Sequence, residues 1–370
     1  MNIRIVSDER EFLSLKDDWN RITQDLIPFQ RFEWIHLWWK YFGKDNDLQI
    51  LIVKEGDTIS GIAPLFIKNM RFLKFLTIRK LCFLGDGIAP YSDFLIQQNQ
   101  NREQVFQSLF QFIFIHLSFD MVGLSNINSH NPHFDLWQKY TDLTNLKLEL
   151  TYQCPKICLS GYTSYKDYFS QLSKNHKQSL KFRQNKVMKS GVDVEYVFKR
   201  DITEEDMETL ATIHVKRQKF LHQKNVPGRF SYFADTKKMA FLKDYFCRCN
   251  HESKILAYMK FDGSPISYIL LMASKNTLFY WNTAFDNDYA FFAPTKLLIH
   301  ELVKYAFENN FTYLDFLRGS DSYKLQWSND MSVNYQLTLR KTLTARLSYL
   351  YKSVVPEFLL PKKLKIQPLE

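Results

Sequence analysis

The chain has 370 residues, of which 45% are hydrophobic and 24% charged, a balance that is typical of globular proteins and excludes disordered or fibrous ones. This length exceeds that of one ordinary domain and suits two. The 49 basic residues outnumber the 39 acidic ones, so the formal net charge of +10 favours an anionic partner such as a phosphate-bearing co-substrate, a nucleic acid or an anionic lipid surface.

Several functional classes are disfavoured by the absence of their motifs. The first ten residues are polar and mixed in charge, unlike a secretory signal, and the longest apolar run (109–117) is too short to span a bilayer. The five cysteines are odd in number and no export signal is seen, so we expect reduced thiols. Their spacing is not that of a structural zinc site, so we expect no metal. There is no nucleophile elbow, P-loop or H-E-x-x-H helix. We therefore expect a cytoplasmic protein outside the simplest hydrolase, NTPase and metalloprotease classes.

The N-terminal part of the sequence predicts helices followed by strands. Apolar residues recur at helical spacing from Phe12 to Leu26, and Asp8 with Glu11 resembles a capping box, so we expect one helix that ends at Pro28. Further along the chain we expect a Trp-rich helix over 32–42, strands over 48–53 and 58–67 joined by a Gly-containing turn, a helix over 102–117 and a strand over 120–125.

The C-terminal part repeats this order. A long helix is expected over 165–189, and its segment from Lys174 to Lys189 has six basic residues and no acidic one. Such a block is ordinarily a solvated face, but it could also guide tRNA, a nucleotide-linked acceptor or an anionic lipid. Thr203, with Asp206 as capping-box partner, opens the next helix. We then expect strands over 254–261, 266–273 and 277–283, a helix over 295–309 and a strand over 312–317.

Two pairs of segments resemble one another. IVKEGDTISGIAPLF, from Ile52, aligns with MKFDGSPISYILLMA, from Met259, and FIFIHLSFDMVGLSNI, from Phe112, aligns with LVKYAFENNFTYLDFLRG, from Leu302. A duplicated mixed α/β unit explains both the likeness and the length. We divide the chain into a first module over 1–155, a second over 156–340 and a basic amphipathic tail over 341–370. The tail could dock on its own domain or lie on a membrane surface.

The segment YLDFLRGSDSYKLQW (313–327) resembles the D-F-x-R-G and Y-K motif of the FemAB-like branch of the GNAT superfamily, of the CelD/BcsL type with a BioF2-like acetyltransferase domain. YWNTAFDNDYAFFAPTKLLIHELVKYAFENN, FQRFEWIHLWWKYFG and GIAPLFI are similar to other parts of that family, so the likeness extends over about Asp8 to Trp327. The resemblance implies two tandem GNAT-like modules, the first degenerate and the second catalytic.

The family resemblance also implies a chemistry. We expect an acyltransferase that moves an acyl group from a thioester, with acyl-CoA as co-substrate and no permanently bound cofactor, to an amine of a sugar, a peptide or a cell-envelope or polysaccharide precursor. Two strands separate to polarise the carbonyl, and a helix N-terminus near Thr295 binds phosphates. Ala293 and Pro294 replace the Gly-rich loop, which leaves open a Fem-like aminoacyl-tRNA-dependent transferase; a catalytically silent binding module is the other alternative. No DNA- or RNA-binding motif occurs, so DNA is not expected as a partner.

The candidate site residues follow from this resemblance together with local chemistry. The catalytic candidates are Asp315, as the base for the amine, Tyr323 and Lys324. The cofactor-binding candidates are Thr295, Lys296, Arg318 and Gly319; the substrate-binding candidates are Arg217, Trp281 and Asp286; no metal ligand is expected. Simpler interpretations remain for several of them: Asp315 could form a buried ion pair with Arg318 or Lys324, Arg217 could extend its stem to water, and the aromatic side chains could pack in the core. His214 is expected to be a core histidine.

Overall fold

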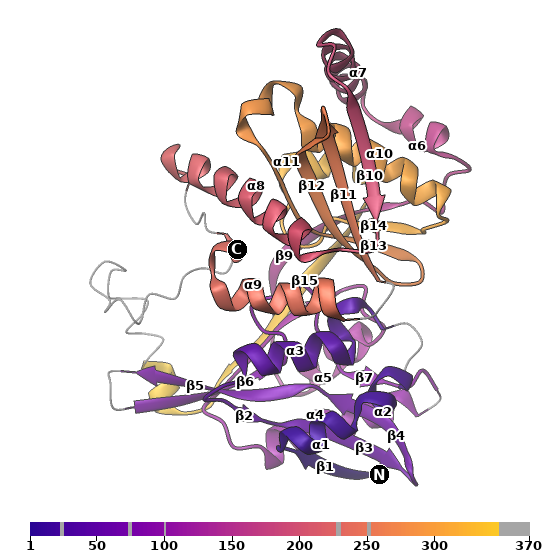
Figure 1. Cartoon of the computed structure of the whole chain (residues 1–370). Helices are drawn as coiled ribbons and strands as arrows, with labels where there is room; N and C mark the ends of the chain where they lie inside the picture. Colours follow the sequence, from indigo (N-terminus) through magenta and orange to yellow (C-terminus); the bar gives the residue numbers. More distant parts are fainter. Residues whose placement is uncertain (23–25, 73–75, 100, 227–230, 250–252, 348–370) are drawn as a thin grey trace. The chain divides into compact units, whose positions relative to one another are not determined.

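The computed structural model describes residues 1–22, 26–72, 76–99, 101–226, 231–249 and 253–347 (Figure 1). The chain forms two compact units, one of residues 153–332 and one of residues 1–152 together with the chain from 333 onward. Two strands, β9 (Leu148–Cys158) and β15 (Asp330–Arg340), begin in one unit and end in the other. The tail expected over 341–370 lies outside the described residues from 348 on.

The N-terminal unit contains two sheets and the helices that cover them. One sheet has the strand order β1-β3-β4-β7, and in the other β15, β8, β6, β5 and β2 are neighbours. The elements are β1 (Asn2–Val6), α1 (Glu9–Ser14), α2 (Lys16–Arg21), a 3-10 helix (Pro28–Gln30), α3 (Phe32–Phe42), β2 (Asp47–Leu48), β3 (Ile50–Glu55), β4 (Thr58–Ala63), β5 (Leu65–Phe72), β6 (Leu76–Phe83), β7 (Leu95–Ile96), α4 (Arg102–His116), β8 (Met121–Asn128) and α5 (Phe134–Leu143).

Two N-terminal elements differ from the sequence prediction. The single helix expected between Asp8 and Pro28 is broken at Leu15, after which α2 directs the Trp19 indole N–H to the Gln30 carbonyl at 2.8 Å. The strand expected over 58–67 is divided at Pro64 into β4 and β5, which belong to different sheets, because proline has no N–H to continue a ladder. The predicted capping box is confirmed in one direction only: Asp8 accepts from the N–H groups of Arg10 and Glu11, whereas the Glu11 carboxylate pairs with Arg4.

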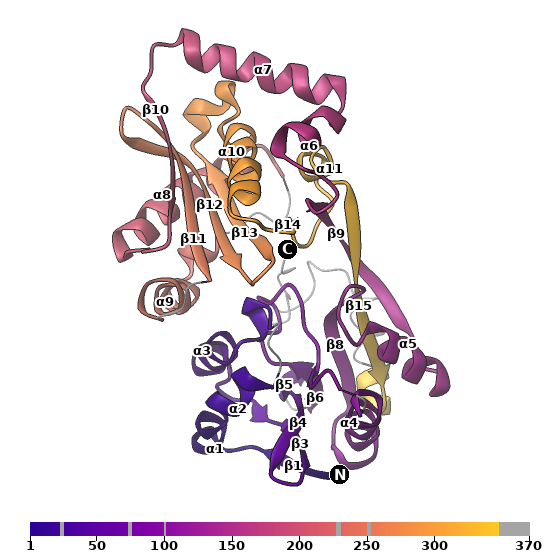
Figure 2. The same cartoon turned by 90° about the vertical axis from the view of Figure 1, so that its right-hand side faces the viewer.

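The C-terminal unit is a three-layer arrangement around the strand order β10-β11-β12-β13-β14-β9. Figure 2 shows α10 on one face of this sheet and α8 and α9 on the other. The elements are α6 (Tyr165–Gln171), α7 (Lys174–Lys189), β10 (Val194–Lys199), α8 (Glu204–Gln223), a 3-10 helix (Tyr232–Ala234), α9 (Thr236–Lys243), a π-helical turn (Asp244–Arg248), β11 (Lys254–Phe261), β12 (Ser264–Ala273), β13 (Thr277–Phe285), a 3-10 helix (Asn287–Phe292), α10 (Pro294–Glu308), β14 (Tyr313–Asp315) and α11 (Ser322–Leu325).

Two predictions in this unit also need correction. The long helix expected over 165–189 is two helices, because Leu172 is extended and Ser173 starts α7 as its N-cap. The strand expected over 312–317 ends at Asp315, since Leu317 has a left-handed φ of 58°. The Thr203–Asp206 capping box is confirmed in both directions.

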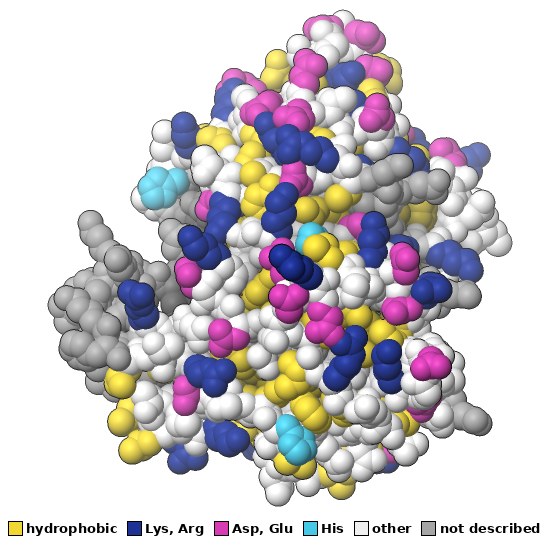
Figure 3. Space-filling view, turned by 60° about the horizontal axis from the view of Figure 1, so that its bottom comes forward, with side chains coloured by type: hydrophobic (Ala, Val, Ile, Leu, Met, Phe, Trp, Pro, Cys, Tyr) yellow, Lys and Arg dark blue, Asp and Glu magenta, His cyan; other side chains and the backbone are white. Residues whose placement is uncertain are grey.

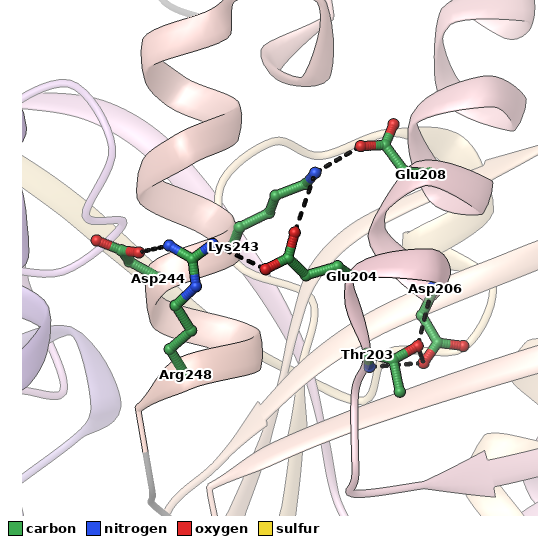
Figure 4. Close-up of polar contacts among 7 residues, drawn as sticks. All are labelled: Thr203, Glu204, Asp206, Glu208, Lys243, Asp244 and Arg248. Atoms are coloured by element: carbon green, nitrogen blue, oxygen red, sulfur yellow. Dashed lines mark hydrogen bonds and ion pairs between the residues drawn. The ribbon is translucent and has the colours of Figure 1, made fainter.

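The outer helices α8 and α9 are joined by a charged cluster. Lys243 pairs with Glu208 at 2.5 Å and with Glu204 at 3.6 Å, and Arg248 bridges Glu204 and Asp244 (Figure 4). Exposed pairs of this kind contribute little each, but together they fix the register of α9 against the start of α8.

The predicted duplication is confirmed by topology. The β3–β4 and β11–β12 segments are both antiparallel hairpins whose turns contain a glycine of positive φ, Gly56 at 60° and Gly263 at 78°. In each unit a helix, α4 or α10, then leads to a strand that pairs in parallel with an earlier one, β8 with β6 and β14 with β13. Each half is therefore a mixed α/β module of the same kind.

Candidate active site

In the C-terminal unit, β13 and β14 pair over three positions only, from Thr277–Tyr313 to Phe279–Asp315. Just beyond them β13 has a bulge: Leu270 of β12 lies opposite Asn282 and Leu271 lies opposite Tyr280, so Trp281 is the extra residue. A bulge bends the strand that carries it. The two parallel strands therefore separate immediately after their last paired position.

The turn after β14 separates the strands from the other side. Asp315 is buried, and its carboxylate accepts a hydrogen bond from the Leu317 N–H at 2.7 Å. Gly319 has a φ of 95°, and its N–H donates to the Gln153 carbonyl at 2.9 Å. The buried Lys324 closes the turn by donating to the Arg318 carbonyl at 2.6 Å. Burial lowers the pKa of the Lys324 ammonium group, and the negative charge of Asp321 partly opposes this shift.

A cavity of about 450 Å³ lies where the strands separate. It is bounded by the end of β13, the start of α10, one face of α8 and the segment around α11, and its lining residues are Arg217, Gln218, Leu221, Thr283, Ala284, Phe285, Ala290, Ala293, Thr295, Lys296, Ile299, Asp321, Tyr323, Gln326 and Trp327. Because Pro294 has no N–H, Thr295 provides the first backbone amide of α10, and the positive end of the helix dipole adjoins the cavity.

The charged groups of the cavity favour an anion. The Arg217 guanidinium lies over the Phe285 ring at 4.2 Å and donates to Asn287 Oδ1. Lys296 donates to Ser179 Oγ at 3.0 Å, and burial lowers the pKa of its ammonium group, with Arg183 adding to the effect. Asp321 is the one acidic side chain among the described lining residues.

Tyr323 supplies a phenol at the cavity wall. Burial, with the Asp321 carboxylate adding to it, raises the pKa of Tyr323 far above its ordinary value, so the hydroxyl keeps its proton over the physiological range. A second contact supports this wall: His176 Nδ1 lies 3.1 Å from Gln326 Oε1, and the His176 ring meets Trp327 edge to face. Gln326, Trp327 and Asp321 were not among the residues predicted from sequence, although all lie within the motif 313–327.

The structure brings together part of the predicted set. Arg217, Thr295, Lys296 and Tyr323 line the cavity. Asp315, Arg318, Gly319 and Lys324 build the turn behind it and are not among its described lining residues.

The remaining predicted residues lie apart from the cavity lining that the structure describes. The Trp281 ring packs with Tyr232 and Phe246, and Asp286 binds Lys216 at 2.6 Å. His214 is a core histidine as expected: it is buried, lies 2.8 Å from Ser231 Oγ, and burial lowers its pKa to about 4.

The corresponding place in the N-terminal unit is filled by the chain itself. β6 and β8 pair in parallel at two positions, and Ser92 then forms a parallel bridge with Ile127. The Ser92 N–H donates to the Asn126 carbonyl at 2.9 Å, and Asn126 Nδ2 donates to the Ala89 carbonyl at 2.9 Å. Residues 88–94 are thus held beside β8 where the C-terminal unit has its cavity.

Among the described residues, no helix is both long and apolar enough to cross a membrane. In the same part of the chain, no three His, Cys, Asp or Glu side chains form a group suited to a metal ion.

Residues 174–325 match a family described as the acetyltransferase (GNAT) domain. None of the curated proteins compared with the chain matches it. Among solved structures, FemX has a TM-score of 0.60 at 12% identity, with 96% of this chain and 100% of that chain covered. L-PGS from Bacillus licheniformis has a TM-score of 0.56 at 8% identity, with 94% of this chain and 97% of that chain covered. A conserved protein of unknown function from Bacteroides thetaiotaomicron VPI-5482 has a TM-score of 0.56 at 10% identity, with 91% of this chain and 100% of that chain covered. These likenesses show a shared fold and confirm the predicted fold class.

Proposed function

We propose that this chain, which contains a GNAT acyltransferase domain over residues 174–325, transfers an acyl group from an acyl-CoA to an amine. The observation that supports this most is the cavity at the point where β13 and β14 separate, with the start of α10 in its wall. Such a gap offers unpaired backbone N–H groups to a carbonyl and a positive helix end to phosphates.

The donor would bind through its phosphates. The Thr295 amide and the Lys296 ammonium group lie in the first turn of α10, and Arg217 of α8 lines the same cavity. Two cations and a helix N-terminus suit a pyrophosphate, because this group is bound by positive charge and hydrogen-bond donors. The thioester would lie along Thr283–Phe285, where β13 no longer pairs with β14.

The transfer step requires one proton to leave the amine and one to reach the thiolate. The neutral amine nitrogen attacks the thioester carbon, the C–N bond forms, and the C–S bond breaks as the carbonyl is restored. We assign Tyr323 as the acid that protonates the departing sulfur, because its raised pKa keeps the phenol protonated. We assign Asp321 the attraction of the incoming ammonium group, which loses one proton to water to become the neutral amine that attacks. After attack the positively charged nitrogen loses a second proton to water, and the Tyr323 phenolate left by protonation of the sulfur regains a proton from water.

The acceptor class proposed is an amine on a sugar, a peptide or a cell-envelope or polysaccharide precursor, in a cytoplasmic setting. The N-terminal unit would serve as a structural module, because residues 88–94 occupy its equivalent of the cavity. This supports a division of the chain into a degenerate first module and a catalytic second one.

The test is ligand binding followed by turnover. Acetyl-CoA, longer acyl-CoAs and free CoA are screened by thermal shift, where a ligand at about 100 times its dissociation constant stabilises by roughly 2.7 kcal/mol. A CoA species that stabilises the protein and releases free thiol in the presence of an amine supports the proposal. The absence of a shift with every CoA species, in a protein that unfolds cooperatively, would refute it.

A second donor is favoured by one observation. Ala293, at a left-handed φ of 54°, and Pro294 stand where a Gly-rich phosphate loop would give several amides. An aminoacyl-tRNA, which binds mainly through a distributed phosphate backbone, depends less on such a loop. Activity that requires charged tRNA and falls steeply with salt would identify this donor.

A further inference from the structure

Helix α7 (Lys174–Lys189) is basic along its whole length. Its 16 residues include Lys174, Lys177, Lys181, Arg183, Lys186 and Lys189 and no acidic residue. On the face of the molecule in Figure 3, acidic and basic side chains are interspersed instead. Lys174, Lys181 and Lys189 are exposed. The outer side of α7 therefore presents an uncompensated positive surface.

Large apolar side chains are exposed among these lysines. Met188 is 77% exposed and Phe182 is 53% exposed on α7, and Phe291, in the 3-10 helix beside it, is 60% exposed. The Lys186 ammonium group lies 4.4 Å from the Phe182 ring and 3.2 Å from the Phe291 ring, which places the two aromatic side chains on either side of one lysine. Apolar side chains held at a surface among cations cost free energy in water unless something covers them.

A groove runs beside this surface. It has a volume of about 800 Å³ and lies between α7, β10 and α10. Its apolar lining residues are Phe169, Val187, Met188, Val192, Val194, Tyr196 and Leu297, and Lys177 and Lys181 lie on its α7 side. Glu301, the one acidic residue of its described lining, is bound by Lys304 at 2.9 Å. The groove thus combines an apolar wall with cations along one side.

We propose that the α7 surface, formed by Lys174, Lys181, Phe182, Lys189, Met188 and Phe291, docks on an anionic membrane, with lipid headgroups at the lysines and apolar side chains in the interface. Cations interleaved with aromatic and aliphatic side chains are the pattern of interfacial helices. An RNA partner would use the same cations and could stack bases on Phe182 and Phe291, but the aliphatic Met188, 77% exposed, offers it neither a ring to stack on nor a strong hydrogen bond. The inference holds whichever donor the cavity takes.

The experiment measures co-sedimentation of the full chain with phosphatidylcholine vesicles that contain or lack phosphatidylglycerol. We expect binding only to the anionic vesicles, weakened by salt. The variant K174Q/K181Q/K189Q should reduce partitioning by at least about tenfold, since it removes three cations that attract anionic headgroups at the membrane surface. The variant F182S/M188S should also bind more weakly while retaining its response to salt.

Matched variants separate the outcomes. K219Q/K224Q/K237Q removes the same charge from exposed positions on α8, at its C-cap and on α9, and should bind vesicles as the parent does. K362Q/K363Q/K365Q removes three of the six basic residues of the tail over 341–370. Unchanged thermal unfolding of every variant shows that α7 still folds. The proposal would be overturned if only the tail variant lost vesicle binding. It would also be overturned if the protein bound RNA through the α7 surface and bound no anionic vesicle.

Discussion

The Asp315 carboxylate accepts a hydrogen bond from the Leu317 N–H at 2.7 Å, and Leu317 itself has a left-handed φ of 58°. A leucine in that region is strained by about 1 kcal/mol or more, so the contact stabilises a conformation that the residue would otherwise avoid. The result is that β14 ends at Asp315, the residue that forms its last pair with β13. The D-F-x-R-G motif therefore opens the cavity by bending the backbone away from β13.

This relationship predicts different effects for two substitutions of Asp315. Asp315→Ala leaves the strained turn without its acceptor and should lower the stability of the protein by about 1–3 kcal/mol, measured by denaturant titration. Asp315→Asn keeps an oxygen for the Leu317 N–H and should lower it less, despite the lost charge opposite Lys324.

The same pair distinguishes a structural Asp315 from a catalytic one. With a structural role, Asp315→Asn retains most of its acyl transfer, because the carboxylate is not among the described residues that line the cavity. A fully folded Asp315→Asn variant without turnover would instead make Asp315 the base that the sequence suggested.

Removal of the Tyr323 hydroxyl should affect turnover and not binding. Tyr323→Phe keeps the ring against the cavity wall and removes only the proton donor, so we expect kcat to fall by about 10²-fold with little change in the KM for the donor. Because the folded pKa of Tyr323 is raised above its ordinary value, the parent enzyme should keep its activity at alkaline pH where a free phenol would ionise.

A donor with a better leaving group provides the control for this assignment. An aryl thioester needs less protonation of its sulfur, so Tyr323→Phe should slow it less than acetyl-CoA. Equal losses with both donors would argue against a role in protonating the thiolate.

Sequence patterns predicted the elements well where a local rule decides them. Thr203 and Asp206 satisfy each other's backbone groups, and Pro294 begins α10, because both effects act within one turn of helix. The duplicated hairpins were also visible, since a Gly-containing turn between alternating apolar residues leaves a clear pattern.

The orientation of site residues depends on interactions that no local pattern reveals. Trp281 was expected in the site, but the bulge at this position directs its ring to Tyr232 and Phe246. Lys324 was expected to act in catalysis, but it closes a turn on the Arg318 carbonyl six residues earlier. Asp321 and Gln326 were missed because exposed polar residues at the two ends of a short helix have the same sequence pattern as ordinary surface residues.

Donor affinity should depend on Lys296. Lys296→Gln removes a cation from the first turn of α10, and we expect the KM for the acyl-CoA to rise by about tenfold, with a smaller change in kcat, because a charge-assisted contact contributes about 1.5–3 kcal/mol. Lys304→Gln is the matched control: it removes the same charge from the same helix, where Lys304 pairs with Glu301 at 2.9 Å. If both variants raised KM equally, the effect would reflect net charge and not a phosphate site at the start of α10.

Asp93 predicts a pH dependence of stability in the N-terminal unit. It is buried, and one carboxylate oxygen accepts from the Trp137 indole N–H and the Phe94 N–H, each at 2.8 Å. Burial nevertheless raises its pKa from 3.8 to about 7. Between these pH values the folded protein binds a proton that the unfolded chain has released, so the free energy of unfolding should fall as pH rises from about 4 to 7 and level off above that.

Asp93→Asn tests this dependence, because an amide oxygen can accept the same two hydrogen bonds and carries no charge at any pH. The parent should lose as much as about 4 kcal/mol of stability across the window, and the variant should lack that part of the slope, so the two curves diverge toward neutral pH. Thermal unfolding of both proteins at pH 5 and pH 8 measures the difference, with acyl-CoA binding as the check that the C-terminal unit is intact. If the stability of the parent and the variant changed with pH in the same way, Asp93 would be ionised in the folded protein at neutral pH. Its charge would then be stabilised by further groups besides the Trp137 and Phe94 N–H donors.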